Sequence, residues 1–255
     1  MLIFSEMYLE LNEPRMFRHI FESIKEHFTH YDLRFETDGL HLQCMDACKV
    51  AVFELFLSSE YFDKYESEYN LVISVDSESF TKACHIIQSD DKLILKNTDN
   101  DKLDFICESE SRNIALKINQ MFSDNEILDC DTFTPTHYIK MDNKTFSQHY
   151  NELKNFDSDN ITFINNDNKK ELSILGNNNN INIQIDCKSE KGGITFIRSH
   201  GILETSYPLK YFAMINKLAP IFKIINLHMS SDYPIKINGN LVNESWIRLI
   251  IAPKQ

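Results

Sequence analysis

The chain has 255 residues, of which 42% are apolar and 25% are charged, and it contains only six glycines and six prolines. This composition is typical of globular domains and argues against a loop-dominated or low-complexity protein. No apolar run reaches the roughly 18–20 residues of a membrane span, and the N-terminus lacks the basic region of a signal peptide, so we expect no membrane partner. The net charge of −12 argues against nucleic-acid binding, although a sum hides how charge is distributed.

Hydrophobic periodicity predicts two helices among short strands in the first half of the chain. The first helix, 14–28, carries an apolar stripe that includes Phe17, Phe21 and Phe28, and the second is expected at 77–88. The expected strands are 2–11, 32–37, 40–46, 50–57, 70–75, 92–97 and 102–108.

The second half of the chain repeats this order at an offset of roughly 125 residues. Its helices are expected at 143–154 and 208–218, again among short strands. We therefore predict an α+β protein with two domains of one fold, 1–118 and 136–255, joined by a connecting segment at 119–135. The strands expected in this half are 136–141, 160–165, 170–175, 180–186, 194–198, 202–207, 223–230, 234–238 and 245–251.

The connecting segment has no clean period and mixes acids with large apolar residues. It is either a solvated linker or a segment that packs along the surface or offers its apolar groups to a partner, and the second interpretation is favoured. Its large apolar residues are Met121, Phe122, Ile127, Leu128 and Phe133.

The cysteines also allow two interpretations. Cys44 and Cys48 lie close together, but no second Cys or His pair follows at a zinc-site spacing. Buried free thiols in a reducing compartment are favoured over structural zinc. The other cysteines are Cys84, Cys107, Cys130 and Cys187.

Basic residues gather on the polar faces of the four expected helices, whereas acids crowd the loops and hairpins. Any solvated helix face carries some Lys and Arg, and Glu22, Glu26, Glu78 and Glu152 dilute the pattern. The alternative is a basic surface on an acidic body, which would contact phosphates without reading bases. The residues of this basic set are Arg15, Arg18, His19, Lys25, Lys82, His85, Lys144, Lys154, Lys210 and Lys217.

Four stretches resemble the proliferating cell nuclear antigen family, the eukaryotic-type DNA sliding clamps. They are GLHLQCMD at 39–46, SSEYFDKYE at 58–66, YFAMINKLAPIFKIINLHMSSDYPI at 211–235 and LIIAPK at 249–254. The resemblance extends along nearly the whole chain and is weakest over 140–200. It implies the DNA-clamp fold, with two helices backed by antiparallel sheets in each domain, and a homotrimeric ring of six domains around duplex DNA.

The resemblance also implies a function without catalysis, cofactor or metal. A clamp holds DNA polymerase and other enzymes on DNA by raising their effective concentration, and a clamp loader opens the ring. The family's DNA-facing positions correspond to Arg18, Lys25, Lys82, Lys210 and Lys217 here. His19 and His85 stand where the family tends to have Lys, and Gln148 and Asn151 where it commonly has Arg, which puts the DNA affinity in doubt.

The family's partners insert a short helical plug of the form Gln-x-x-aliphatic-x-x-aromatic-aromatic into an outer pocket. Met45 corresponds to the floor of that pocket, where a flexible thioether suits varied plugs, although it could also be a simple core methionine. The matching positions are Met45, Val50, Ile127, Leu128, Pro234, Ile250, Ile251, Ala252 and Pro253.

Subunit contacts in the family pair one edge strand with a different edge strand of the next subunit, which closes a ring if the rotation allows. The corresponding segments here are 111–118 and 178–185. Their expected interface residues are Ser111, Ile114, Leu116, Ile118, Asn178, Ile181, Ile183 and Ile185. The resemblance implies a nuclear location, or a viral replication factory if the chain is viral.

Two other functions stay open. One is a divergent clamp-like processivity factor that acts as a monomer or in a hetero-oligomer. The other is a metal-dependent nuclease built on the acids of 89–105, although Asp99 and Asp101 lie at an expected hairpin turn, where Asp is common in any case.

Overall fold

The computed structural model describes residues 7–67, 70–99, 101–123, 127–130, 134–165, 171–188 and 193–254. The chain divides into two compact units. Unit 1 comprises Met1–Ala47, Phe53–Ile127 and Leu241–Ile247, and unit 2 comprises Cys48–Val52, Leu128–Asn240 and Arg248–Gln255. Each unit therefore includes a short segment from the other half of the chain, which the sequence does not predict.

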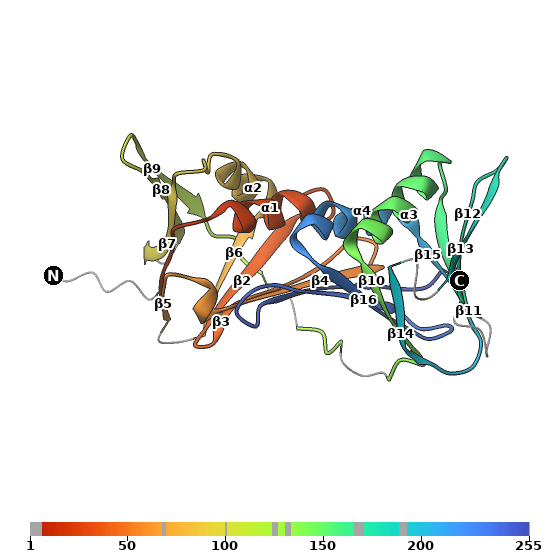
Figure 1. Ribbon diagram of the computed structural model, residues 1–255. Coiled ribbons are helices and arrows are strands. Elements are labelled where there is room, and N and C mark those ends of the chain that lie inside the picture. The colour runs from red at the N-terminus through yellow and green to blue at the C-terminus, as the bar shows by residue number, and fades with distance from the viewer. Residues whose placement is uncertain are drawn as a thin grey trace. The chain divides into compact units, whose positions relative to one another are not determined.

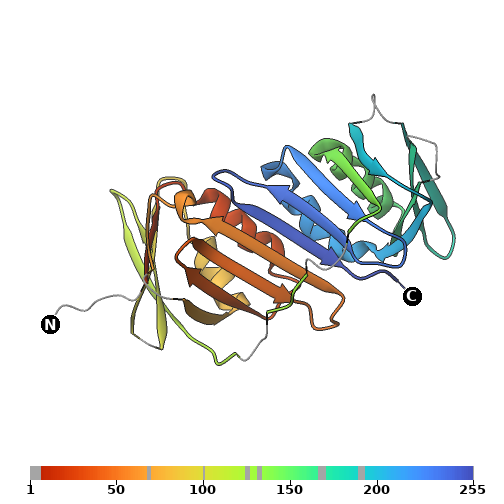
Figure 2. The same ribbon diagram turned by 90° about the horizontal axis from the view of Figure 1, so that it is seen from below.

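Unit 1 contains two antiparallel sheets and a pair of helices (Figures 1 and 2). One sheet has the strand order β5-β1-β7-β8-β9, and the other contains the order β6-β2-β3-β4. The helices are α1 (Arg15–Ile24) and α2 (Ser77–His85). The strands are β1 (Met7–Leu11), β2 (His30–Glu36), β3 (Gly39–Met45), β4 (Ala51–Ser58), β5 (Lys64–Ser67), β6 (Leu71–Asp76), β7 (Lys92–Asp99), β8 (Lys102–Glu108) and β9 (Asn113–Asn119), with a 3-10 turn at Ser59–Tyr61.

The core of unit 1 lies where the helix pair packs on the sheets. The rings of Phe17, Phe21, Tyr31 and Phe105 all lie within 6.3 Å, centroid to centroid, of the Phe80 ring of α2. These side chains are fully buried, and burying each aromatic ring contributes on the order of 1.5–3 kcal/mol. The apolar stripe of α1 thus fixes which face of the helix points inward.

Unit 2 has the same composition of elements. One sheet contains the order β14-β10-β16-β17-β18, and the other has the order β13-β12-β11-β15. The helices are α3 (Asn143–Asn155) and α4 (Leu209–Leu218). The strands are β10 (His137–Asp142), β11 (Asn160–Asn165), β12 (Glu171–Asn177), β13 (Asn182–Lys188), β14 (Ile194–Ser199), β15 (Leu203–Pro208), β16 (Ile224–Met229), β17 (Ile235–Asn240) and β18 (Trp246–Ile251), with a 3-10 turn at Ala219–Ile221.

The core of unit 2 is again aromatic. Phe212 of α4 lies 6.1–6.5 Å, centroid to centroid, from the rings of Phe146, Phe163 and Tyr207. The helices pack against β10, β11 and β16. Figure 2 shows the helix pair on one face of the sheet that contains β10 and β16. Phe212 thus has the same role in unit 2 as Phe80 has in unit 1.

The two units repeat one topology. Each runs strand, helix, five strands, helix and three strands. The order β5-β1-β7-β8-β9 corresponds to β14-β10-β16-β17-β18, and β6-β2-β3-β4 corresponds to β15-β11-β12-β13. The α+β fold predicted from the sequence is confirmed. Within the described ranges, no helix is long and apolar enough to cross a membrane.

Both helices of unit 1 end earlier than the sequence predicts. Helix α1 ends at Ile24 rather than at 28, and Phe28 enters the core from the following turn. Helix α2 ends at His85 rather than at 88, because the Asp91 carboxylate accepts the Gln88 N–H at 2.7 Å and holds the chain in a turn. Residues 2–6 of the strand expected at 2–11 lie outside the described residues.

Strand β5 was not predicted. Its sequence, KYES, has one large apolar side chain and no alternation, so it carries no periodic signal. It forms because β1 offers its backbone as a pairing partner, in a register that sets Tyr65 opposite Leu9.

Candidate functional site

The first candidate surface is the outer side of the helix pair of unit 1 (Figure 1). Arg15 is exposed on α1, His19 is half-buried, and Lys25 follows at the C-cap. Lys82 and His85 are exposed on α2. Within unit 1 the structure therefore brings the predicted basic residues onto neighbouring helices.

A shared carboxylate links these helices. The Glu22 carboxylate of α1 accepts from Arg18 Nε at 2.6 Å and lies 2.7 Å from His85 Nδ1 of α2. Because a carboxylate only accepts hydrogen bonds, His85 Nδ1 carries the proton. Arg18 also donates from Nη1 to the Ile87 carbonyl at 2.7 Å. The sequence could suggest the Arg18–Glu22 pair from its i,i+4 spacing, but it gives no sign that distant His85 joins it.

A groove of about 610 Å³ lies beside this cluster. Lys25, Thr29, Lys82 and His85 line it, together with acidic residues. The exposed Lys82 ammonium lies 2.6 Å from Glu78, and this hydrogen bond raises the Lys82 pKa. The groove is thus lined by both signs of charge, and two of its basic side chains, Lys82 and His85, are already paired with carboxylates.

The helix pair of unit 2 carries four lysines and one acid, Glu152. Lys144, Lys154 and Lys210 are exposed, and the Lys210 ammonium lies 4.7 Å from the centre of the Tyr211 ring. Lys217 is half-buried on α4. These are the remaining members of the predicted basic set.

Two residues of α3 itself hold the acid of this helix. The Glu152 carboxylate is 3.0 Å from His149 Nδ1 and accepts from the Gln148 amide at 2.9 Å. These two hydrogen bonds, that of His149 first, lower the Glu152 pKa. Gln148 therefore points along the helix to Glu152.

The second candidate set comprises the predicted pocket residues, which are divided between the units. Met45, the last residue of β3, and Ile127 belong to unit 1 and are 41% and 63% exposed. Exposure at this level does not fit a simple core methionine. In unit 2 the Ala252 N–H donates to the Val50 carbonyl at 2.8 Å, which brings these two residues together.

The remaining pocket residues differ in exposure. Leu128 is 40% exposed, and Pro234 and Pro253 are half-buried. Ile250 and Ile251 are 8% and 0% exposed, so they can support the chain next to Ala252 but offer little surface to a peptide.

The connecting segment begins as an ordered extension of unit 1. The Met121 N–H donates to the Ser74 carbonyl at 2.8 Å, and the Ser123 hydroxyl donates to Asp32 at 3.0 Å. Phe122 between them is 92% exposed. Phe133 lies outside the described residues. The described part of the segment therefore runs along the surface and presents apolar side chains to solvent, as the favoured interpretation requires.

The third candidate surface comprises the ends of two sheets. Strand β9 ends the five-stranded sheet, and β13 ends the four-stranded sheet of unit 2. Ile114, Leu116 and Ile118 lie in β9, whereas Ser111 precedes it. A groove of about 550 Å³ beside β9 is lined by Leu116 and Ile118.

On the other sheet, Ile183 and Ile185 lie in β13. Ile181 immediately precedes the strand and is 43% exposed. Asn178 lies in the turn before it, where its side-chain oxygen accepts from the Asn180 and Ile181 N–H groups at 2.8 Å. The Asn-rich stretch is thus a turn that leads into a strand.

Among the side chains that the structure describes, the acids of 89–105 do not form a common site. Asp91 is fully buried and forms a two-point ion pair with Arg112, which lowers the Asp91 pKa, and Asp104 lies 3.7 Å from Lys117. Asp101 lies in the β7–β8 turn, and the side chain of Asp99 is outside the described residues. Acids that are already paired with cations are poor metal ligands, which speaks against the nuclease interpretation.

One constellation resembles the triad of a cysteine hydrolase. Cys187 Sγ of β13 lies 3.4 Å from His149 Nε2, and His149 Nδ1 contacts Glu152. Burial, however, raises the pKa of the Cys187 thiol to about 11, so the thiolate that acts as nucleophile is scarce near neutral pH. The arrangement is therefore a buried structural contact.

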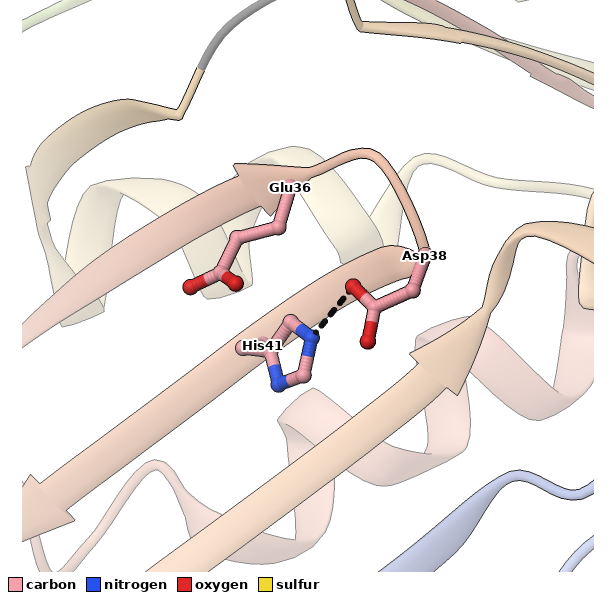
Figure 3. Close-up of side chains that lie close together, drawn as sticks. All are labelled: Glu36, Asp38 and His41. Atoms are coloured by element: carbon pink, nitrogen blue, oxygen red, sulfur yellow. Dashed lines mark hydrogen bonds and ion pairs between the residues drawn. The ribbon is translucent and has the colours of Figure 1, made fainter.

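The six cysteines are all free thiols, and four of them are buried. In the part of the chain that the structure describes, the one group of three close metal-ligating side chains contains no cysteine: it is Glu36, Asp38 and His41 on the β2–β3 hairpin (Figure 3). His41 Nε2 already bonds Asp38 at 2.9 Å, and cationic Arg34 pairs directly opposite His41. This geometry favours a hairpin contact over a cation site.

Comparison with known proteins supports the same family as the motifs. Residues 7–131 match the family model for the N-terminal domain of proliferating cell nuclear antigen. DNA polymerase sliding clamp 3 of Sulfurisphaera tokodaii is 23% identical, with 97% of this chain and 99% of the relative covered. Proliferating cell nuclear antigen 2 of Drosophila melanogaster is 22% identical, with 96% of each chain covered.

A viral relative and a solved structure extend this comparison. A probable DNA polymerase sliding clamp of Autographa californica nuclear polyhedrosis virus is 21% identical, with 96% of this chain and 95% of the relative covered. A chain in the crystal structure of the PCNA2–PCNA3 complex from Sulfolobus tokodaii is 21% identical, with a TM-score of 0.88 over 97% of this chain and 99% of that one.

The fold and these relatives define the class as DNA sliding clamps. The chain belongs to the proliferating cell nuclear antigen family. The resemblance and the clamp fold predicted from the sequence are confirmed.

Proposed function

We propose that the chain is a DNA sliding clamp, a processivity factor that encircles duplex DNA and tethers DNA polymerase and other replication and repair enzymes. The observation that carries this proposal is the duplicated unit of two sheets and a helix pair in this chain. Relatives named as sliding clamps align with the chain along almost their whole length. A tether needs no reacting groups, so the proposed protein is not an enzyme and needs no cofactor.

The assembly proposed is a homotrimer. Strand β9 of one subunit would pair with β13 of the next, because both end their sheets and carry half-buried isoleucines. We propose residues 1–118 and 136–255 as the clamp domains and 119–135 as their connection. The alternative is a hetero-oligomer, which is favoured by the solved relative that was crystallised as a PCNA2–PCNA3 complex.

Light scattering after size exclusion, over a dilution series, separates these assemblies. A homotrimer has a mass near three times the 29.9 kDa of the chain. A monomer that persists at high concentration would contradict the homotrimer and leave a clamp-like processivity factor that acts as a monomer or in a hetero-oligomer. The proposed locations are the nucleus or a viral replication factory.

The helix surfaces are the proposed DNA contacts. The double charge reversal Lys82→Glu/Lys217→Glu should reduce clamp loading and processive synthesis, because phosphate contacts supply most of the non-specific affinity for DNA. The matched control Lys64→Glu/Lys102→Glu makes the same change of net charge on the strands β5 and β8. Equal polymerase stimulation by the two double variants would contradict this assignment of the lining.

The exposed Met45 and Ile127 are proposed to bind the plug motif Gln-x-x-aliphatic-x-x-aromatic-aromatic. Met45→Ala/Ile127→Ala should weaken binding of such a peptide at least tenfold, since each truncation removes roughly 1 kcal/mol or more of apolar contact. Val72→Ala, which truncates another exposed side chain of unit 1, is the control. Peptide affinity is measured by calorimetry, and an unchanged oligomer mass shows that assembly is intact.

A further inference from the structure

We propose that Glu22 occupies the place of a DNA phosphate between α1 and α2, and that Arg18 and His85 exchange its carboxylate for a phosphate when duplex DNA is bound. This inference rests on the proposed function as a clamp. It assigns to Glu22 a role that sets the strength of DNA binding.

The cluster has the geometry of an anion-binding site in which the Glu22 carboxylate is the bound anion. One oxygen of Glu22, Oε1, lies 2.6 Å from Arg18 Nε and 2.7 Å from His85 Nδ1. The two donors come from different helices and converge on this single oxygen. A phosphate oxygen accepts the same two hydrogen bonds, and Arg is especially suited to phosphate because its planar fork offers several donors.

The donors are accessible enough for such an exchange. The Arg18 side chain is 36% exposed and His85 is 45% exposed, whereas Glu22 beneath them is 23% exposed. Arg18 stays anchored through its Nη1 hydrogen bond to the Ile87 carbonyl when Nε changes its acceptor. The exchange therefore needs side-chain rotation and no movement of either helix.

The charge of the helix pair explains why this carboxylate matters. Helix α1 carries Arg15, Arg18 and Glu22, and α2 carries Glu78 and Lys82. With His neutral, three cations and two acids give a formal charge of +1, and loss of the Glu22 charge gives +2. A clamp has to slide, so an internal competitor that weakens each phosphate contact suits its function.

The experiment measures binding of the assembled protein to a fluorescent duplex as a function of salt concentration. Glu22→Gln should bind several-fold more tightly than the unmodified protein at low salt. It should also increase the slope of log affinity against log salt by about one, the value expected when the helix pair offers the DNA one more net positive charge. Added inorganic phosphate is a second arm, which tests whether the freed donors bind a single phosphate without the duplex.

Two matched variants isolate the mechanism. Glu66→Gln removes the same charge from β5, where Glu66 is paired with Lys64 at 3.0 Å, and should leave the slope unchanged. In an Arg18→Ala/His85→Ala background, adding Glu22→Gln should restore little affinity, because the two donors it would release are absent. A gain of equal size in both backgrounds would mean a long-range charge effect and would overturn the exchange.

Oligomer mass and melting temperature are measured for each variant, so a folding defect is recognised. Suppose that the unmodified protein stimulates a polymerase on DNA and that the Glu22→Gln variant binds DNA with the same affinity and salt slope as the unmodified protein. The proposed exchange is then wrong, and the proposed function as a clamp is unaffected. If the unmodified protein neither binds duplex nor stimulates a polymerase at any salt, the proposed function fails first.

Discussion

Units 1 and 2 share a topology but differ in how polar groups secure their helices. In both, one aromatic residue of the second helix, Phe80 or Phe212, gathers rings from the first helix and the sheets. In unit 1, charged groups link elements that are far apart in the sequence, through Glu22 and through the Asp91–Arg112 pair. In unit 2, the Glu152 carboxylate is held instead by His149 and Gln148 of its own helix.

The difference shows which part of the repeat defines the fold. Apolar burial scales with area and tolerates changes of residue, so both halves keep their cores while their sequences differ. Charged contacts depend on precise geometry, and a buried charge without its partner costs free energy. They are therefore the features in which the two units differ. Unit 1 has the two-helix anion cluster, and unit 2 has no equivalent among its described residues.

The largest expected effect is on the buried ion pair of unit 1. Arg112→Ala should lower the free energy of unfolding by roughly 3–5 kcal/mol, because it leaves the buried Asp91 carboxylate without its partner. The fluorescence of Trp246, the single tryptophan, reports on unit 1 during urea unfolding.

Arg198→Ala is the control in unit 2. Arg198 donates to the Pro135 carbonyl at 3.2 Å from an exposed position, so its loss should change stability by no more than about 0.5 kcal/mol. Equal losses in the two variants would remove the contrast between the units.

The helix caps provide a smaller, matched comparison. Asp76 accepts the Ser79 N–H at 2.7 Å at the start of α2, and Asp142 accepts both the N–H and the hydroxyl of Thr145 at 2.8 Å at the start of α3. Asp76→Ala should cost about 1 kcal/mol and Asp142→Ala about 2 kcal/mol, because the second cap loses two hydrogen bonds. Thermal unfolding measures both, and a larger loss in Asp76→Ala would reverse this order.

Much of the fold could be predicted from the sequence, because it follows from local apolar patterns. The stripe of α1, the turn at Asp38–Gly39 and the alternation in β13 each depend on neighbouring residues. Strand β5 could not be predicted, since its pairing with β1 is a non-local backbone contact without an apolar pattern.

The candidate surfaces were predictable in part. Family motifs pointed to Met45 and to the basic helix residues, but exposure and pairing needed the structure. Side chains such as Glu22 and His85 are 63 positions apart, and only packing of α1 on α2 brings them together. The same holds for Arg112, whose partner Asp91 lies across a hairpin.

The smallest expected effect concerns the acid of α3. Hydrogen bonds from His149 and Gln148 lower the Glu152 pKa, so Glu152 contributes stability above its unfolded pKa of about 4.3 and loses it as the pH falls through its folded pKa. Because the carboxylate is 37% exposed, Glu152→Gln should cost only about 0.3–0.5 kcal/mol at neutral pH.

This cost should shrink as the pH falls through the lowered folded pKa of Glu152, because the unmodified carboxyl is then protonated as well. Unfolding by urea over a series of pH values from 7 downward measures it, with Glu171→Gln at the exposed start of β12 as the control. A cost that stays constant over the whole series would show that the Glu152 side chain stabilises α3 by packing. The polar anchoring of unit 2 would then be independent of charge, and the contrast with unit 1 would be sharper still.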